Sequence, residues 1–244
     1  MPQEQGTALT DELAQRWLTT FRTNMLEQRA EQIAEKSTEE SSEKLTQAWL
    51  RLLQHYQQPH RHYHNMSHIH ACLIWFDKVK AQLQNPLAVE LAIWFHDVIY
   101  DVRKSDNELQ SGYYAVTALT NLGVSASLIQ QVYELILLTQ HPNKPEPQSV
   151  DKQDQALLLD IDLSVLGQSQ NVYRVYEAAI RAEYQHVPSW LYKFARKRLL
   201  KSFLKQPVIY HSRYFQEKFE HQARLNIQSA LACRVSRGSQ RRIG

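Results

Sequence analysis

The segment from Leu87 to Tyr100 constrains the fold more than any other part of the sequence, because it is almost wholly apolar. Only Glu90, His96 and Asp97 interrupt it. A helix that is hydrophobic on all sides belongs at the centre of a bundle. A carboxylate in such a helix is costly to bury unless it is paired or binds a cation. The segment therefore predicts an interior helix whose His-Asp pair points to a bound metal ion.

Apolar residues recur at helical spacing along the rest of the chain, and this pattern predicts an all-α bundle. The chain has only six Gly and eight Pro in 244 residues, and no segment has a convincing strand pattern. Several helix starts are predicted from N-cap residues, namely Thr10, Asn65, Asn85 and Ser125. Ser105 to Glu108 has the spacing of a capping box, which predicts another helix start. Three last helices are expected near 171–185, 189–204 and 211–235. One helical domain over 1–235 is the expected organisation.

Charge and targeting signals restrict the class of protein. Net charge is +3, but Arg237, Arg241 and Arg242 lie in the basic tail at 236–244, which we expect to be flexible. The rest is near neutral, so no surface for polymeric nucleic acid is expected. Two cysteines without a CxxC motif fit a reducing compartment. With no leader pattern and no apolar run near 18 residues, we expect a cytoplasmic protein without a membrane partner.

A histidine cluster precedes the apolar segment. Five imidazoles fall within eleven residues: His60, His62, His64, His68 and His70. His64 and His68 are four residues apart, so one helical turn would stack them on the same face. If Asn65 is instead the N-cap, His64 lies just before the helix and can lean over its N-terminus. Cys72, one turn after His68, is interpreted as a buried thiol rather than as a ligand.

Two further segments supply the remaining candidate ligands. His96 and Asp97 are neighbours about 100° apart on a helix, so both reach one ion only near a helix end or a crossing. Asp160 and Asp162 stand in a third apolar stretch. Imidazole nitrogen and carboxylate oxygen together are the donors of a divalent transition-metal site. Facing helices of a bundle build such sites in their core.

The order of these residues resembles the HD-domain superfamily of metal-dependent phosphohydrolases. The first motif below is also similar to the opening metal motif of cyclic-nucleotide phosphodiesterases, and the four later motifs look like a bacterial family of predicted HD phosphohydrolases of unassigned substrate. The likeness extends from about residue 45 to 230, with a motif core near 60–167. The motifs are Tyr63-His64-Asn65-x-x-His68, Trp94-Phe95-His96-Asp97-x-x-Tyr100, Asp160-Ile161-Asp162-Leu163-x-x-Leu166-Gly167, Ile180-Arg181-x-Glu183-Tyr184 and Ala223-Arg224-x-Asn226.

The resemblance implies a ligand set and a general acid. The implied ligands of a divalent ion (Mn, Mg, Zn, Co or Fe) are His68, His96, Asp97 and Asp162. His64 would be the general acid, and Asp97 would also orient the attacking water. Asp160 competes with Asp162 for the ligand role, and the motif alignment favours Asp162. A second ion stays open, with His141 as the only spare ligand candidate.

The expected activity is hydrolysis of a phosphate ester or phosphoanhydride in a small phosphorylated molecule, a nucleotide being one candidate. Side chains that could hold the phosphate are Arg61, Arg103, Lys104 and Arg181. Glu108 is interpreted either as part of the capping box or as a residue near the substrate. Substrate identity and oligomeric state stay open.

Two other functions remain as alternatives. A paired-iron oxygenase on the same fold would need more His or carboxylate ligands than the sequence offers. A non-catalytic binding or regulatory module would use the metal only as a staple, with four protein ligands and no open position.

Overall fold

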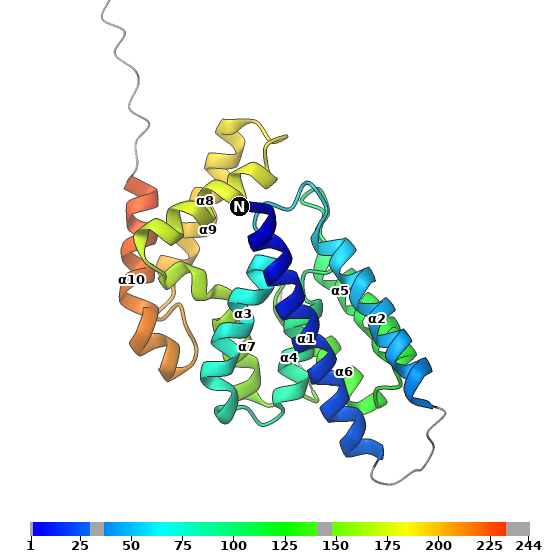
Figure 1. Ribbon diagram of the computed structural model, residues 1–244. Coiled ribbons are helices and arrows are strands. Elements are labelled where there is room, and N and C mark those ends of the chain that lie inside the picture. The colour runs from blue at the N-terminus through cyan, green and yellow to red at the C-terminus, as the bar shows by residue number, and fades with distance from the viewer. Residues whose placement is uncertain (1, 30–36, 141–147, 233–244) are drawn as a thin grey trace, which may run out of the picture.

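The computed structural model describes residues 2–29, 37–140 and 148–232, and within them the chain is all-α (Figure 1). No strand occurs in these residues, which confirms the predicted fold class. The α-helices are α1 (Pro2–Arg29), α2 (Ser37–Tyr56), α3 (Met66–Val79), α4 (Pro86–Phe95), α5 (Asn107–Asn121), α6 (Ala126–Leu138), α7 (Lys152–Asp162), α8 (Gln170–Glu183), α9 (Ser189–Lys205) and α10 (Arg213–Ala232). Two short 3₁₀ helices are η1 (Lys80–Gln82) and η2 (Leu163–Gly167). None of the helices in these ranges has the length and apolar character needed to cross a bilayer.

Helix α4 lies at the centre of the bundle, as its all-round apolar surface predicts. It packs against α3, α5, α6 and α7, and all its residues from Ala88 to Phe95 are buried. Its one interior carboxylate, Glu90, accepts hydrogen bonds from Arg16 Nε at 2.8 Å and Thr20 Oγ1 at 3.1 Å. The buried charge is therefore paired, and the pair also fixes α1 on the surface of α4.

Helices α1 and α2 pack against each other beside α4 through three indole rings (Figure 1). The ring centroid of Trp17 lies 6.3 Å from that of Trp49 and 5.7 Å from that of Trp94. The N-cap predicted at Thr10 is wrong, because α1 begins at Pro2 and contains this residue. The apolar face that packs on the core begins near Thr10, but a helix can extend beyond the face that it buries.

Three of the other predicted helix starts are observed. Asn65 Oδ1 accepts a hydrogen bond from Ser67 N at 2.9 Å, and Asn85 Oδ1 accepts one from Ala88 N at 3.1 Å. Both are N-cap bonds of the predicted kind. Ser125 also occupies the N-cap position of its helix, α6, but its hydroxyl makes no capping bond.

The predicted capping box from Ser105 to Glu108 is wrong. Helix α5 begins at Asn107, and no side chain makes a capping bond there. Instead, the side-chain amide of Asn107 bonds to both the backbone N–H and the carbonyl of Asp101, at 3.0 Å each. This link to the preceding loop replaces a local cap and makes Glu108 the second residue of α5.

The helices α8, α9 and α10 lie together at one side of the bundle (Figure 1) and match the three predicted last helices within a few residues. Helix α10 packs closely against η2: a Cβ added to Gly167 would lie 2.3 Å from Phe219 Cβ. The amide of Asn226 on α10 donates to the carbonyls of Leu166 and Gln168, at 2.8 Å each. These contacts fix the C-terminal end of α7, which carries Asp162. The predicted basic tail at 236–244 lies outside the described residues.

Candidate metal centre

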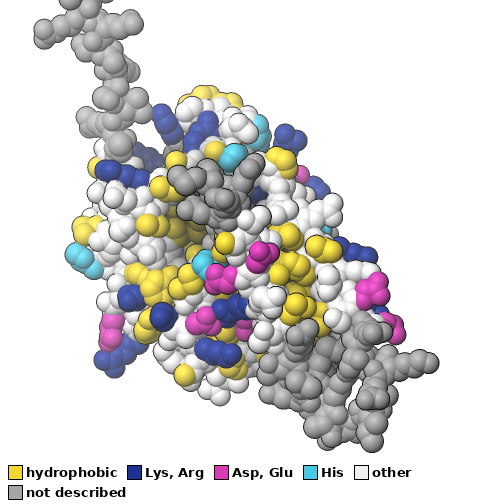
Figure 2. Space-filling model, viewed as in Figure 1, with side chains coloured by type: hydrophobic (Ala, Val, Ile, Leu, Met, Phe, Trp, Pro, Cys, Tyr) yellow, Lys and Arg dark blue, Asp and Glu magenta, His cyan; other side chains and the backbone are white. Residues whose placement is uncertain are grey.

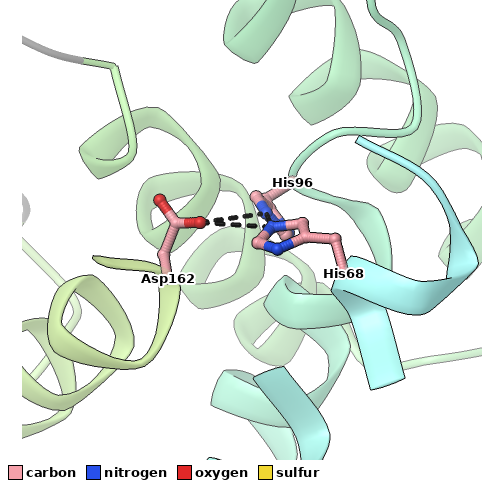
Figure 3. A group of neighbouring side chains, drawn as sticks. All are labelled: His68, His96 and Asp162. Atoms are coloured by element: carbon pink, nitrogen blue, oxygen red, sulfur yellow. Dashed lines mark hydrogen bonds and ion pairs between the residues drawn. The ribbon is translucent and has the colours of Figure 1, made fainter. Parts of the chain in front are cut away.

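Three segments distant in sequence bring metal-ligand side chains together in the core. Figure 3 shows His68, His96 and Asp162 pointing toward one another. His68 lies in the first turn of α3, which Asn65 caps, so it is part of the helix rather than of the loop. Helix α4 ends at Phe95, and His96 is its C-cap residue. Neighbouring residues inside a helix point about 100° apart, but α4 ends here. The side chains of His96 and the following residue Asp97 can therefore both approach the donor group.

The donor atoms are close enough to share one ion. His68 Nε2 lies 3.2 Å from His96 Nε2 and 3.3 Å from Asp162 Oδ1, and His96 Nε2 lies 3.6 Å from the same oxygen. Metal bonds of about 2.0–2.2 Å give donor separations of about 3.3–3.6 Å along a tetrahedral edge. The three atoms therefore fit one face of a coordination tetrahedron.

Asp97 approaches the same two imidazoles from the end of α4. Its Oδ2 lies 3.1 Å from His96 Nε2 and 3.6 Å from His68 Nε2. The four predicted ligands are thus neighbours in the structure, with His68, His96 and Asp162 as the compact group.

The orientation of His96 is fixed by a bond outside the donor group. Its Nδ1 lies 2.9 Å from the carbonyl oxygen of Ile93, and because a carbonyl only accepts, Nδ1 carries the hydrogen. In the neutral ring the lone pair is therefore on Nε2, the atom that faces His68 and Asp162, whereas in the protonated ring Nε2 donates to Asp162. The bond from Nδ1 to a carbonyl is the usual way in which a protein orients a metal-binding imidazole.

The carboxylates of the site are electrostatically suited to a cation. Burial would raise the pKa of Asp162, but hydrogen bonds with His68 and His96 outweigh it and hold the pKa well below its usual range. Burial also opposes ionisation of Asp97, yet the charges of His96 and His64 lower its pKa. Two ionised carboxylates beside imidazole nitrogens in a buried site attract a divalent ion.

Asp160, the competing candidate, is used elsewhere. Its side chain is fully buried and accepts bonds from His211 N at 2.7 Å, Ser212 N at 2.6 Å and Ser212 Oγ at 2.6 Å. It thereby holds the segment that leads into α10, away from the imidazoles. These bonds also explain why α10 begins at Arg213 rather than at the predicted residue 211.

The other histidines of the cluster lie outside the donor group. His60 Nε2 lies 3.0 Å from the carbonyl oxygen of Tyr100. His62 is exposed, and His70 faces Glu12, with 3.4 Å between His70 Nε2 and Glu12 Oε1. None of these three imidazoles is part of the donor group.

His64, the predicted general acid, is held by a buried carboxylate from α8. His64 Nδ1 lies 2.7 Å from Glu183 Oε2, and Tyr100 Oη donates to the same oxygen at 2.8 Å. Glu183 Oε1 accepts from the backbone N–H groups of Tyr63 and His64, at 2.7 and 3.0 Å. Four bonds to one carboxylate thus fix the ring of His64 and the loop that carries it.

The pKa values of this pair favour a charged interaction. Burial would lower the pKa of His64, but the charge of Asp97 and the bond to Glu183 raise it above its ordinary value. For Glu183, burial is outweighed by the bond to His64 and by the backbone donors, which lower its pKa to about 2. Glu183 is the functional residue that sequence reasoning missed. Its only signal was its place in the motif Ile180-Arg181-x-Glu183-Tyr184, to which no role was assigned.

A cavity of about 660 Å³ opens onto the donor group. His64, His96, Asp97 and Asp162 line its polar end. Its far wall comes from α8, α9 and the residues between them, and is rich in apolar and tyrosine side chains: Ile180, Tyr184, Val187, Leu191, Tyr192, Leu199 and Phe203. The cavity can therefore hold a molecule with a polar group at the donor atoms and an apolar body.

Arg61 is not available to hold a phosphate in this cavity, which corrects the sequence prediction. It is only 5% exposed, and its guanidinium donates to Asp97 O at 2.6 Å, Val98 O at 2.8 Å and His64 O at 3.1 Å. It also lies over the rings of Tyr56 and Tyr100. Arg61 therefore ties the histidine loop to the end of α4.

The other predicted phosphate-binding residues divide between the cavity and the surface. Lys104 lines the cavity, whereas Arg103 lines a separate surface pocket. Arg181 donates to Tyr184 O at 2.6 Å and Val187 O at 3.2 Å, so it holds the turn after α8, and it is not among the residues that line the cavity.

Glu108 and His141 are the two remaining candidate residues. Glu108 lines the cavity, where burial and the charges of Asp97 and Asp162 raise its pKa. His141 lies outside the described residues. Within the described residues, the compact His–carboxylate group contains donors for one ion.

Comparisons with protein-family models, with curated proteins and with solved structures each found no match to this chain.

Proposed function

We propose that this protein is a metal-dependent phosphohydrolase that cleaves a phosphate ester. The observation that supports this proposal is the triangle of donor atoms from His68, His96 and Asp162 at the polar end of a cavity. A divalent ion held there would supply hydroxide near neutral pH and polarise a phosphoryl oxygen. An ion beside a substrate-sized cavity has room for an open coordination position, which a purely structural site does not need.

The side chains around the triangle have distinct proposed roles. Asp97 would complete the ligand set, since its Oδ2 already lies 3.1 Å from His96 Nε2. His64 would donate a proton to the departing oxygen. With Nδ1 held by Glu183, its Nε2 is the ring atom left for a substrate in the cavity. Glu183 is then a positioning residue that favours the protonated imidazole.

The charges of the cavity support a substrate with a single phosphoryl group. The cations along its wall are Lys104 and Arg196. Arg196 is already paired with Glu177, at 2.5 Å between its Nη2 and Oε1. One lysine that makes no ion pair within the described residues, beside one ion, suits a phosphomonoester or phosphodiester better than a triphosphate chain. The apolar far wall favours an ester of a bulky apolar or aromatic alcohol.

Neither alternative function has comparable support. A paired-iron oxygenase needs a second set of ligands, and the compact group among the described residues offers donors for one ion. A metal-stapled regulatory module does not require a cavity of this size at the ion or a histidine held by a buried carboxylate.

The proposal is tested with the full chain after chelation and reloading with Mn, Mg, Zn, Co or Fe separately. Released phosphate is measured from aryl and long-chain alkyl phosphates and from nucleoside triphosphates, and the monoester product is measured from a phosphodiester and from cyclic nucleotides. We expect metal-dependent turnover that is higher for esters with apolar alcohols than for triphosphates, and its loss in His68→Ala and His96→Ala. A fully metal-loaded chain that cleaves none of these substrates would contradict the proposal.

A further inference from the structure

Helix α9 has two different faces. Leu191, Tyr192 and Leu199 point to the cavity and form part of its wall. On the opposite side, Trp190 is 72% exposed and Phe194 is 67% exposed. These two aromatic residues are four apart and therefore lie one above the other on the outer face.

The same outer face is strongly basic. Between residues 189 and 205 the helix has no Asp or Glu. Its exposed cations are Lys193, Lys197, Arg198, Lys201 and Lys205. Lys197 and Lys201 follow Trp190 by seven and eleven residues, so they continue the stripe that begins with the two aromatic residues. The sixth cation, Arg196, points inward to Glu177.

The turn between α8 and α9, where α9 begins, lies at one end of the molecule, at the top of Figure 1, and Figure 2 shows hydrophobic and Lys or Arg atoms next to one another in that region. Isolated exposed apolar side chains are common and need no explanation. A tryptophan and a phenylalanine one turn apart, within a helix that has only basic charges, are the composition of a helix that lies on a membrane surface.

We propose that the outer face of α9 docks on an anionic lipid membrane. Trp190 and Phe194 would enter the headgroup region, where an aromatic ring can bury its apolar body. Lys197 and Lys201, with the other cations, would contact anionic headgroups. A second copy of the chain fits less well, because equivalent basic faces would repel each other. Docking would also bring the α9 wall of the cavity close to the bilayer.

The test is sedimentation of the full chain with vesicles of phosphatidylcholine alone or with about one-third phosphatidylglycerol, at low and high salt. We expect binding to the anionic vesicles only, weakened by salt. Lys197→Glu with Lys201→Glu should reduce the affinity by at least about tenfold, since each basic residue near an anionic surface contributes about fivefold. The matched control is Lys78→Glu with Lys152→Glu, which makes the same charge change on α3 and α7.

Fluorescence reports the aromatic contact separately. Trp17, Trp49 and Trp94 are buried and Trp75 is half-buried against Phe219, so the part of a blue shift with anionic vesicles that depends on residue 190 is assigned to Trp190. Trp190→Phe should keep vesicle binding and lose this shift, whereas Trp190→Ser with Phe194→Ser should lose binding.

Four outcomes would overturn the proposal. The chain could fail to bind anionic vesicles at low salt, or the control pair of lysine variants could weaken binding as much as the α9 pair. Self-association abolished by Trp190→Ser, without vesicle binding, would assign the face to a second copy. Binding to single-stranded nucleic acid in place of vesicles would assign it to that polymer.

Discussion

Asp160 and Asp162 are two residues apart on α7, yet their carboxylates serve different parts of the molecule. Asp160 is fully buried and bonds to the backbone and hydroxyl groups of the segment before α10. Asp162 Oδ1 lies 3.3 Å from His68 Nε2, within the donor group. Two residues turn an α-helix by about 200°, so neighbouring acids on one helix point in nearly opposite directions.

Substitution of Asp162 should affect metal binding, whereas substitution of Asp160 should affect the stability of the fold. Asp162→Ala should lose most of the bound metal while the metal-free protein melts near the wild-type temperature. Asp160→Ala should keep the metal but lose about 3 kcal/mol of unfolding free energy, because three donors lose a buried acceptor. Elemental analysis and thermal unfolding of both variants measure this. Equal metal loss in both would contradict the assignment of Asp162 as the ligand.

Rate measurements should distinguish His64 from the ligands. His64→Ala should retain metal and lose turnover by a factor of about 10² to 10⁴, as expected for an acid–base group. The loss should be smaller for p-nitrophenyl esters, whose leaving group needs no proton. Asp97→Ala should lose metal and turnover together on every substrate. If His64→Ala loses metal as His68→Ala does, His64 is a ligand and not an acid.

Removal of the metal should lower the melting temperature, because an ion that binds only the folded state stabilises it. At a metal concentration a thousandfold above Kd, the expected shift is roughly 10 °C for a chain of this length. His68→Ala and His96→Ala should abolish the shift. His62→Ala and His70→Ala are the controls, since neither imidazole faces the donor group, and they should leave it intact. A wild-type melting temperature that does not respond to verified chelation would argue against the site.

In the metal-free protein, the contribution of Glu183 to the stability of the fold should depend on pH in the acid range. Its pKa is lowered from 4.5 to about 2 in the folded chain, despite burial, by His64 and two backbone donors. A lowered carboxyl pKa stabilises the fold above pH 4.5, and this contribution disappears as the pH falls toward 2. Glu183→Gln should therefore be less stable than wild type near pH 6, and the difference should shrink between pH 4.5 and 2. A difference that is constant across this range would contradict the ionic role.

Substitution of Arg61 should lower the stability of the fold, whereas substitution of Lys104 should weaken substrate binding. Arg61→Ala leaves the carbonyls of Asp97 and Val98 without donors and should cost about 3 kcal/mol of unfolding free energy. Lys104→Ala removes an exposed cation of the cavity and should raise KM with little change in stability. Thermal unfolding and steady-state kinetics of both variants provide the comparison. An unchanged melting temperature for Arg61→Ala would restore it as a candidate for substrate binding.

Local features of the sequence were enough to predict the helices and the central position of α4. Asn65 and Asn85 mark helix starts because an N-cap bond reaches only two or three residues. The apolar segment from Leu87 predicts burial because no face of it can be left in water. Thr10 and Ser105 show the limit of such reasoning: α1 extends beyond its apolar face, and Asn107 bonds to a loop rather than to its own helix.

The tertiary structure alone decided which polar side chains meet. His64 and Glu183 are 119 residues apart, and no local pattern relates them. The sequence identified His68, His96, Asp97 and Asp162 as candidates, but their distances depend on where α3, α4 and α7 end against one another. The same packing turned Arg61 from a candidate for phosphate binding into a buried link between two backbone segments. Periodicity and capping act within one helix, whereas a buried charge takes whichever partner the folded chain brings near.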